Sequence, residues 1–207
     1  MSQKILKSSL ALAISVASSY SLASGFALNE QSISSMGTAF AGRSSSADDA
    51  TTLYGNPAGM SRLKREEVSA GAAVVIAKTD IKHADGSLSG SNDGDMVPVV
   101  GVPMGYYVKP IDDKVSFGIG MYVPFGLVTD YESDFQGRYF GDKSEVQVIT
   151  LQPTVSYRFN DNLSIGFGPT INHISGELTS KIPSFTPEDG KVKIKGDDVA
   201  IGYNPVS

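Results

Sequence analysis

The chain has 207 residues, a formal net charge of −5 and 41% hydrophobic residues. Outside the extreme N-terminus, no stretch approaches the ~18 consecutive apolar residues of a membrane-spanning helix. The acidic balance argues against a nucleic-acid partner, the absence of Cys excludes a disulfide framework, and the two His residues leave little material for a metal or catalytic site.

Residues 1–23 have the pattern of a secretory signal peptide. Lys4 and Lys7 precede an apolar run over residues 10–17, and Ser21 and Ala23 are small residues at the −3 and −1 positions of a cleavage site. The alternative, an N-terminal anchor helix, is disfavoured because the apolar run is too short to span a bilayer. We expect an exported chain that is cleaved after Ala23.

Residues 24–65 are rich in Ser, Ala, Gly and Asp and show no strict alternation. Ile33, Met36 and Phe40 form one stripe of a short helix that Gly42 is expected to end. The stretch 46–49 predicts a second helix start, because a hydroxyl precedes two acids. The turn-rich stretch 54–59 follows. The segment reads as short helices and turns, and it is too small to fold alone.

From about residue 66 the apolar residues alternate with small or polar ones, which predicts β-strands. Each covers about 10–14 residues, longer than the 5–6 usual in globular sheets. Tyr106, Tyr122, Tyr157 and Phe159 lie near strand ends, where interfacial aromatic girdles sit in membrane barrels. The expected strands are 68–80, 96–108, 115–125, 149–159 and 163–171, with the start of a sixth near the C-terminus.

The connections between these strands alternate in length. Residues 110–114 and 160–162 predict tight turns, whereas 81–95, 126–145 and 175–196 predict long polar loops. Short turns at one end and long loops at the other are typical of outer-membrane barrels. A secreted β-sandwich also alternates, but strand length, loop asymmetry and the signal peptide favour the barrel.

Several short blocks resemble one known family, and they occur in chain order. The blocks are SGFALNEQ at 24–31, MGTAFAG at 36–42, ADDA at 47–50, NPA at 56–58, FGLVT at 125–129, and GDD at 196–198 with GYN at 202–204. Together they are similar to the FadL/TodX family of outer-membrane transporters for long-chain fatty acids and hydrophobic aromatics.

The resemblance implies a fold and a place in the cell. The fold is an all-β, transmembrane antiparallel barrel of fourteen strands, plugged by an N-terminal helical hatch. Residues 24–65 correspond to the hatch, and residues 66–207 to about six wall strands. We therefore expect the truncated N-terminal half of a transporter, unable to form a pore alone. The implied location is the outer membrane of a Gram-negative bacterium, beside lipid and lipopolysaccharide, with a monomer as the full-length state.

The resemblance also implies passive transport without a cofactor. Ligand is captured at extracellular loops, passes the hatch and leaves sideways at a kink in the third strand. An enzyme is not expected, because a lipase-like barrel needs a Ser nucleophile beside a His, and no nucleophile elbow is present. A structural or adhesive barrel without a transport role stays open as an alternative.

Three sets of residues are the expected functional positions. Three alternatives stay open: Pro124 marks a strand end, the NPA block is a generic turn, or the apolar loop is ordinary loop packing. The sets are Asn56, Pro57 and Ala58 in the hatch; Pro124, Phe125 and Gly126 at the kink; and Leu127, Val128, Tyr131, Phe135, Tyr139 and Phe140 in the ligand-capture loop.

Basic residues that would bind a ligand carboxylate are not singled out by the sequence. Arg138, Lys143 and Arg158 are candidates, and Arg158 adjoins a tight turn, which favours an interfacial role. Arg43 is expected to pair with Asp48 or Asp49 rather than with a ligand.

Overall fold

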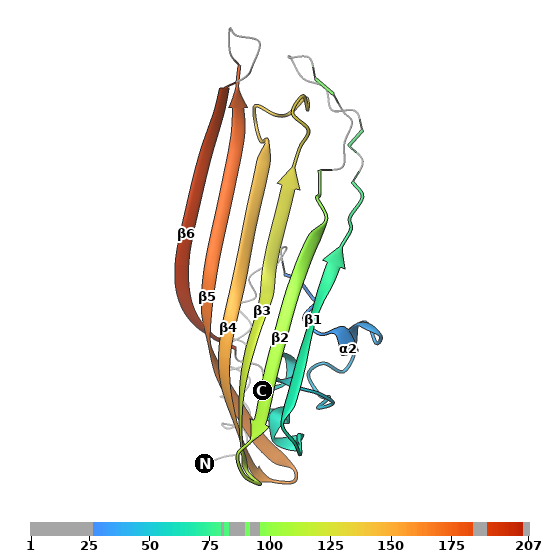
Figure 1. The fold of residues 1–207 in the computed structure, drawn as a ribbon, viewed down its shortest axis with the longest axis vertical. Helices are drawn as coiled ribbons and strands as arrows, with labels where there is room; N and C mark the ends of the chain where they lie inside the picture. Colours follow the sequence, from blue (N-terminus) through green and yellow to red (C-terminus); the bar gives the residue numbers. More distant parts are fainter. Residues whose placement is uncertain (1–26, 80, 83–89, 92–95, 184–189, 205–207) are drawn as a thin grey trace, which may run out of the picture.

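A computed structural model describes residues 27–79, 81–82, 90–91, 96–183 and 190–204. Its strands form one antiparallel sheet in the order β1-β2-β3-β4-β5-β6 (Figure 1). The all-β prediction is confirmed; the signal peptide and most of loop 81–95 lie outside the described residues. The strands are β1 Glu67–Val75, β2 Val100–Pro110, β3 Val115–Asp130, β4 Lys143–Asn160, β5 Leu163–Ile182 and β6 Gly190–Asn204.

β3, β4 and β5 are longer than the alternation predicted, whereas β1 and β2 are shorter than the predicted 68–80 and 96–108. The loop assignments 126–145 and 175–196 are wrong at both ends. β3 runs to Asp130, β4 begins at Lys143 and β5 runs to Ile182. Above the apolar zone the cross-strand neighbours are charged, so the hydrophobic period disappears while the backbone pairing continues. Glu177 of β5, for example, is 2.6 Å from Lys193 Nζ and 3.0 Å from Lys195 Nζ of β6.

The two tight turns are confirmed, because β2 and β3 are joined by residues 111–114 and β4 and β5 by 161–162. Arg158 ties these turns together: its Nε donates to the Asp113 carbonyl at 3.1 Å, and its guanidinium lies 3.8 Å from Asp161.

The sheet is apolar on its outer face and polar on its inner face, the reverse of a soluble protein and the arrangement found in the wall of a membrane barrel. Its outer face carries apolar side chains that are 38–83% exposed, and its inner face carries buried hydroxyl and amide groups. Within the described part of the chain, no helix is long and apolar enough to cross a membrane. The outer set includes Phe117, Met121, Leu151, Val155, Ile165, Phe167 and Ile201, and the inner set Ser116, Thr150, Gln152, Thr154, Ser156 and Thr170.

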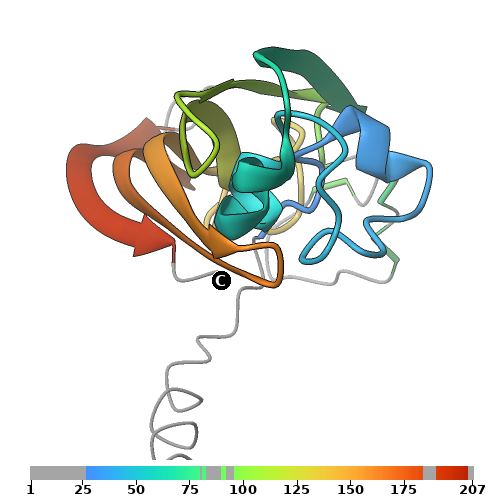
Figure 2. The ribbon, with the colours of Figure 1, turned by 90° about the horizontal axis from the view of Figure 1, so that it is seen from below.

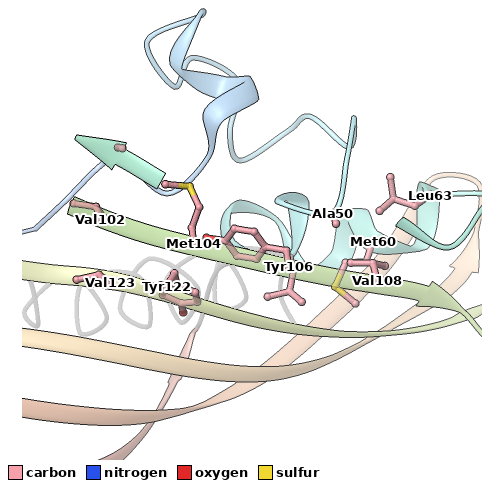
Figure 3. Close-up of a cluster of buried hydrophobic side chains, with 11 residues drawn as sticks. Ala50, Met60, Leu63, Val102, Met104, Tyr106, Val108, Tyr122 and Val123 are labelled. Atoms are coloured by element: carbon pink, nitrogen blue, oxygen red, sulfur yellow. The ribbon is translucent and has the colours of Figure 1, made fainter. Parts of the chain in front are cut away.

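β2 departs from this pattern because its apolar residues face inward. They pack against Met60 (Figure 3) and also against Leu53, both in the N-terminal segment, which we define as residues 27–65. Tyr106 and Tyr122 belong to this core and are only 3% exposed, so their assignment to an aromatic girdle was wrong. The inward residues of β2 are Val102, Met104, Tyr106 and Val108.

Tyr157 and Phe159 do lie on the exposed outer face, as a girdle requires. Their ring centroids are 4.9 Å apart in an edge-to-face arrangement. The strand end where they sit is the one with the tight turns.

The N-terminal segment lies in the concavity of the curved sheet (Figure 2). Its elements are α2 (Ile33–Met36), α3 (Thr52–Gly55) and the 3-10 helix η1 (Pro57–Arg62). The stripe predicted over Ile33, Met36 and Phe40 is wrong: α2 ends at Gly37, and Phe40 has a positive φ of 63°. The second helix begins at Thr52, later than 46–49 suggested, because the Asp49 carboxylate closes a turn on the Thr51 amide instead.

Glycines on the inner face of the sheet allow the N-terminal segment to approach the sheet closely. A Cβ at Gly118 would lie 2.6 Å from Leu53 Cδ1, and one at Gly166 would lie 2.4 Å from the Ala58 nitrogen. At Gly166 the obstacle is backbone, which cannot rotate away as a side chain can. The absence of a side chain there fixes how deeply η1 seats.

Replacing Gly166 with Ala should destabilise the packing of η1 by about 1–3 kcal/mol, because the new methyl group overlaps the backbone of Pro57 and Ala58. The measurements are denaturant unfolding of the protein in detergent micelles and the rate of protease cleavage within residues 27–65. Gly105→Ala is the matched control, since a Cβ there meets nothing within 4 Å. Equal unfolding midpoints for the two variants would contradict this packing.

Candidate functional site

β3 carries a bulge at the expected kink. Tyr122 pairs with Thr150 and Phe125 with Val148, so three steps along β3 match two along β4. Pro124 lies inside this irregularity, where its missing N–H costs no ladder bond. The strand continues to Asp130, so Pro124 does not mark a strand end. We call residues 122–125 the wall bulge.

The N-terminal segment supplies partners for the backbone that the wall bulge leaves unpaired. We call its first five described residues, 27–31, the sealing segment. Tyr106 of β2 contacts the end of this segment: its hydroxyl donates a hydrogen bond to the Gln31 carbonyl at 2.8 Å. The contacts with the bulge are Leu28 N to Pro124 O at 2.9 Å, Gln31 Nε2 to Val123 O at 2.6 Å, and a bridge between Ala27 and Phe125.

The wall bulge also changes which face the following residues present. Below it the odd-numbered side chains of β3 point outward, whereas Phe125 pairs with Val148 and both line a hollow on the inner side. This inner hollow has a volume of about 530 Å³ and lies between α3 and the inner faces of β3 to β6. Tyr54 of α3 borders it, with its ring centroid 4.7 Å from that of Tyr122.

The NPA block is placed at a different part of the wall. The Asn56 side chain caps η1 by accepting a hydrogen bond from the Gly59 amide at 3.1 Å. Pro57 and Ala58 are buried against Gly166 of β5. The contacts at the wall bulge come instead from the sealing segment and Tyr54.

The residues expected to form a capture loop are divided between strand and loop. Leu127 and Val128 belong to β3, and the others lie in the connection to β4. Tyr131 and Phe135 stack with ring centroids 4.5 Å apart, while Phe140 is 96% exposed. The Tyr139 hydroxyl accepts a hydrogen bond from Arg138 Nη2 at 2.7 Å.

The three basic candidates are all engaged within the protein. Arg138 bonds Tyr139, Lys143 lies 2.7 Å from Glu145, and Arg158 bridges the two turns. Arg43 differs, since its expected ion pair with Asp48 or Asp49 does not form. The guanidinium carbon lies 5.3 Å from the centroid of the Tyr54 ring.

Asp49 is instead satisfied by hydroxyl and amide donors. Its carboxylate accepts from the Ser34 hydroxyl at 2.6 Å and from the Thr51 hydroxyl and amide at 2.6 and 2.8 Å. Burial by itself would raise the pKa of Asp49, but these hydrogen bonds outweigh it and hold the pKa below its usual value.

Comparisons with known proteins agree with this geometry. The family described as "Outer membrane protein transport protein (OMPP1/FadL/TodX)" matches residues 14–205. A long-chain fatty acid transport protein of Escherichia coli O6:H1 is 31% identical over 99% of this chain and 51% of its own length. Outer membrane protein P1 of Haemophilus influenzae (strain Rd) is 32% identical over 80% of this chain and 39% of its own.

The fold also has a counterpart among solved structures. A crystal structure of a Pseudomonas aeruginosa FadL homologue superposes with a TM-score of 0.69 at 21% identity, covering 86% of this chain and 48% of that one. At this identity the likeness concerns the fold alone. The chain spans about half the length of the first relatives it matches.

Acidification should loosen the N-terminal segment through Asp49. Because its folded pKa is lowered, its stabilising effect is present above the ordinary Asp pKa of about 3.9 and is lost as the pH falls through the lower folded value. We expect Asp49→Asn to lower the free energy of unfolding at neutral pH and to match the native protein once the pH has fallen below the lowered folded pKa. Asp48→Asn, at the exposed neighbour, is the control; a pH-independent difference for Asp49→Asn would contradict the assignment.

Proposed function

Because the chain belongs to the outer membrane protein transport protein family (OMPP1/FadL/TodX), we propose that it moves long-chain fatty acids or other hydrophobic small molecules passively across the outer membrane. The family consists of transport proteins rather than enzymes. The observation that carries the proposal is the wall bulge closed by the sealing segment, since it combines a break in the wall with a removable cover.

Capture takes place at the aromatic connection between β3 and β4. Phe140 is almost fully exposed, and the stacked pair Tyr131 and Phe135 gives a flat apolar surface beside it. Burying a methylene is worth about 0.8 kcal/mol, so a long acyl chain gains affinity from even a shallow apolar surface. Leu127 and Val128 extend this surface down β3 toward the wall bulge.

From there the ligand enters the inner hollow and passes residues 24–65, which act as a hatch. Asn56, Pro57 and Ala58 anchor the hatch to β5, because the cap on η1 and the contact at Gly166 fix that turn. Anchoring on the β5 side leaves the sealing segment free to move at β3 without unseating the whole hatch.

Exit takes place sideways at Pro124, Phe125 and Gly126. The sealing segment is held there by few hydrogen bonds, each with a net value of about 0.5–1.5 kcal/mol. A ligand that buries several methylenes against Phe125 and the sealing segment can therefore compete with these bonds. No other energy source is required, since the ligand moves down its gradient.

The apolar outer face of β3 to β6 is the surface for membrane lipid. Above it, the charged rows that include Lys143, Glu145 and Glu177 lie at the level of lipopolysaccharide headgroups. We keep a monomer as the proposed state of the full-length protein.

A bulky residue at Gly126 should block the exit. A Cβ added at Gly126 would lie 3.2 Å from Leu28 Cδ1. The ring of Gly126→Phe would therefore occupy the space between the wall bulge and the sealing segment. Uptake of a labelled long-chain fatty acid by cells that produce the full-length protein with this substitution should fall on the order of tenfold, about 1.4 kcal/mol in the barrier. Gly101→Phe is the control, because its Cβ meets nothing within 4 Å. Undiminished uptake in Gly126→Phe cells would remove the lateral exit, and no uptake by unaltered protein would favour a structural or adhesive barrel.

A further inference from the structure

A cationic nitrogen at the inner hollow has no partner within the described residues. Arg43 Nη1 is buried and donates to no hydrogen-bond acceptor in the part of the chain that the structure describes. The ion pairs formed among these residues involve other side chains. A buried charged N–H without an acceptor is costly, so a position of this kind favours an anion supplied from outside.

The surroundings hold the Arg43 guanidinium in place without using its donors. The rings of Tyr54 and Phe40 lie 5.3 and 6.0 Å from its central carbon. Aromatic contacts of this kind engage the cation through the ring face, while the N–H donors lie in the guanidinium plane and stay available. Gly55 makes room for the stem, since a Cβ there would lie 2.3 Å from Arg43 Cγ.

The rest of the inner hollow matches an amphiphile. Its polar groups bond one another: Thr150 Oγ1 donates to Asn172 Oδ1 at 2.7 Å, and Asn172 Nδ2 donates to Thr170 Oγ1 at 3.1 Å. Phe125 and Ile174 supply apolar surface in the same hollow. A neutral hydrocarbon would cover the apolar part and leave Arg43 without an acceptor, whereas an acid satisfies both.

We propose that Arg43 anchors the carboxylate of a long-chain acid in the inner hollow, and that it thereby selects acids over neutral hydrophobic molecules of the same length. The inference rests on the proposed transport function and adds the residue that discriminates between ligand classes. A guanidinium pairs with a carboxylate through two parallel hydrogen bonds, which gives orientation as well as affinity. The acyl chain then lies along Phe125, next to the wall bulge.

The test is equilibrium binding of radiolabelled palmitate and of methyl palmitate to the purified full-length protein in detergent micelles, at a pH where the acid is ionised. Arg43→Met should raise the dissociation constant for palmitate about ten- to a hundredfold and leave that for the methyl ester unchanged. Arg43→Lys keeps the charge but lacks the planar guanidinium. Its dissociation constant for palmitate should lie between those of the unaltered protein and Arg43→Met. Arg65→Met is the matched control, because the Arg65 side chain is 83% exposed.

Gly55→Ala offers an independent variant, since it displaces the Arg43 stem while keeping the charge, and it should lose the same preference for the acid. Retained binding of methyl palmitate shows that each variant is folded. Equal weakening of both ligands, or unchanged palmitate binding in Arg43→Met, overturns the assignment while leaving transport in place. Failure of the unaltered protein to bind either ligand overturns both proposals.

Discussion

The backbone groups that β3 leaves unpaired at the wall bulge are the constraint on which the other features depend. Lipid offers no hydrogen bonds, so a break in a membrane wall must find its partners within the protein. Here the sealing segment provides them, through the Leu28 amide and the Gln31 side chain. The same contacts bring the start of the N-terminal segment against Pro124 and Phe125, two residues that line the inner hollow. A strand without the bulge would need no such cover.

Close packing against wall glycines positions the rest of the N-terminal segment. Leu53 fills the space over Gly118, and the NPA turn occupies the space over Gly166. The inward apolar face of β2 completes this core through Met104 and Tyr106. Fixing α3 in this way also fixes Tyr54, whose ring borders the guanidinium of Arg43. The packing of α3 against the sheet thus determines where the Arg43 guanidinium lies in the inner hollow.

The sequence predicted the strands wherever apolar and small residues alternate, as in 115–125, 149–159 and 163–171, and it predicted the break at Pro124. It failed above the apolar zone, because charged pairs such as Lys193 with Glu177 sustain strand pairing without a hydrophobic period. It also placed Tyr106 in a girdle, since alternation identifies two faces of a strand but not which one packs against the N-terminal segment. The sealing segment and Arg43 were missed because their roles depend on contacts between residues far apart in the chain. One signal could have indicated the sealing segment: a bulge leaves backbone carbonyls unpaired, and these carbonyls need donors from elsewhere in the chain.

The change of face at the wall bulge has a consequence for how β3 can vary between related genes. Residues on either side of the bulge serve opposite environments although they follow the same odd-numbered series: Met121 is exposed on the outer face, and Phe125 lines the hollow. Loss of one codon at 123 or 124 would restore a regular ladder in which Phe125 still pairs with Val148 and keeps its face, but the unpaired carbonyls that the sealing segment covers would be lost. Length at these two positions is therefore under stricter constraint than chemical identity, and an insertion or deletion there does more harm than a substitution.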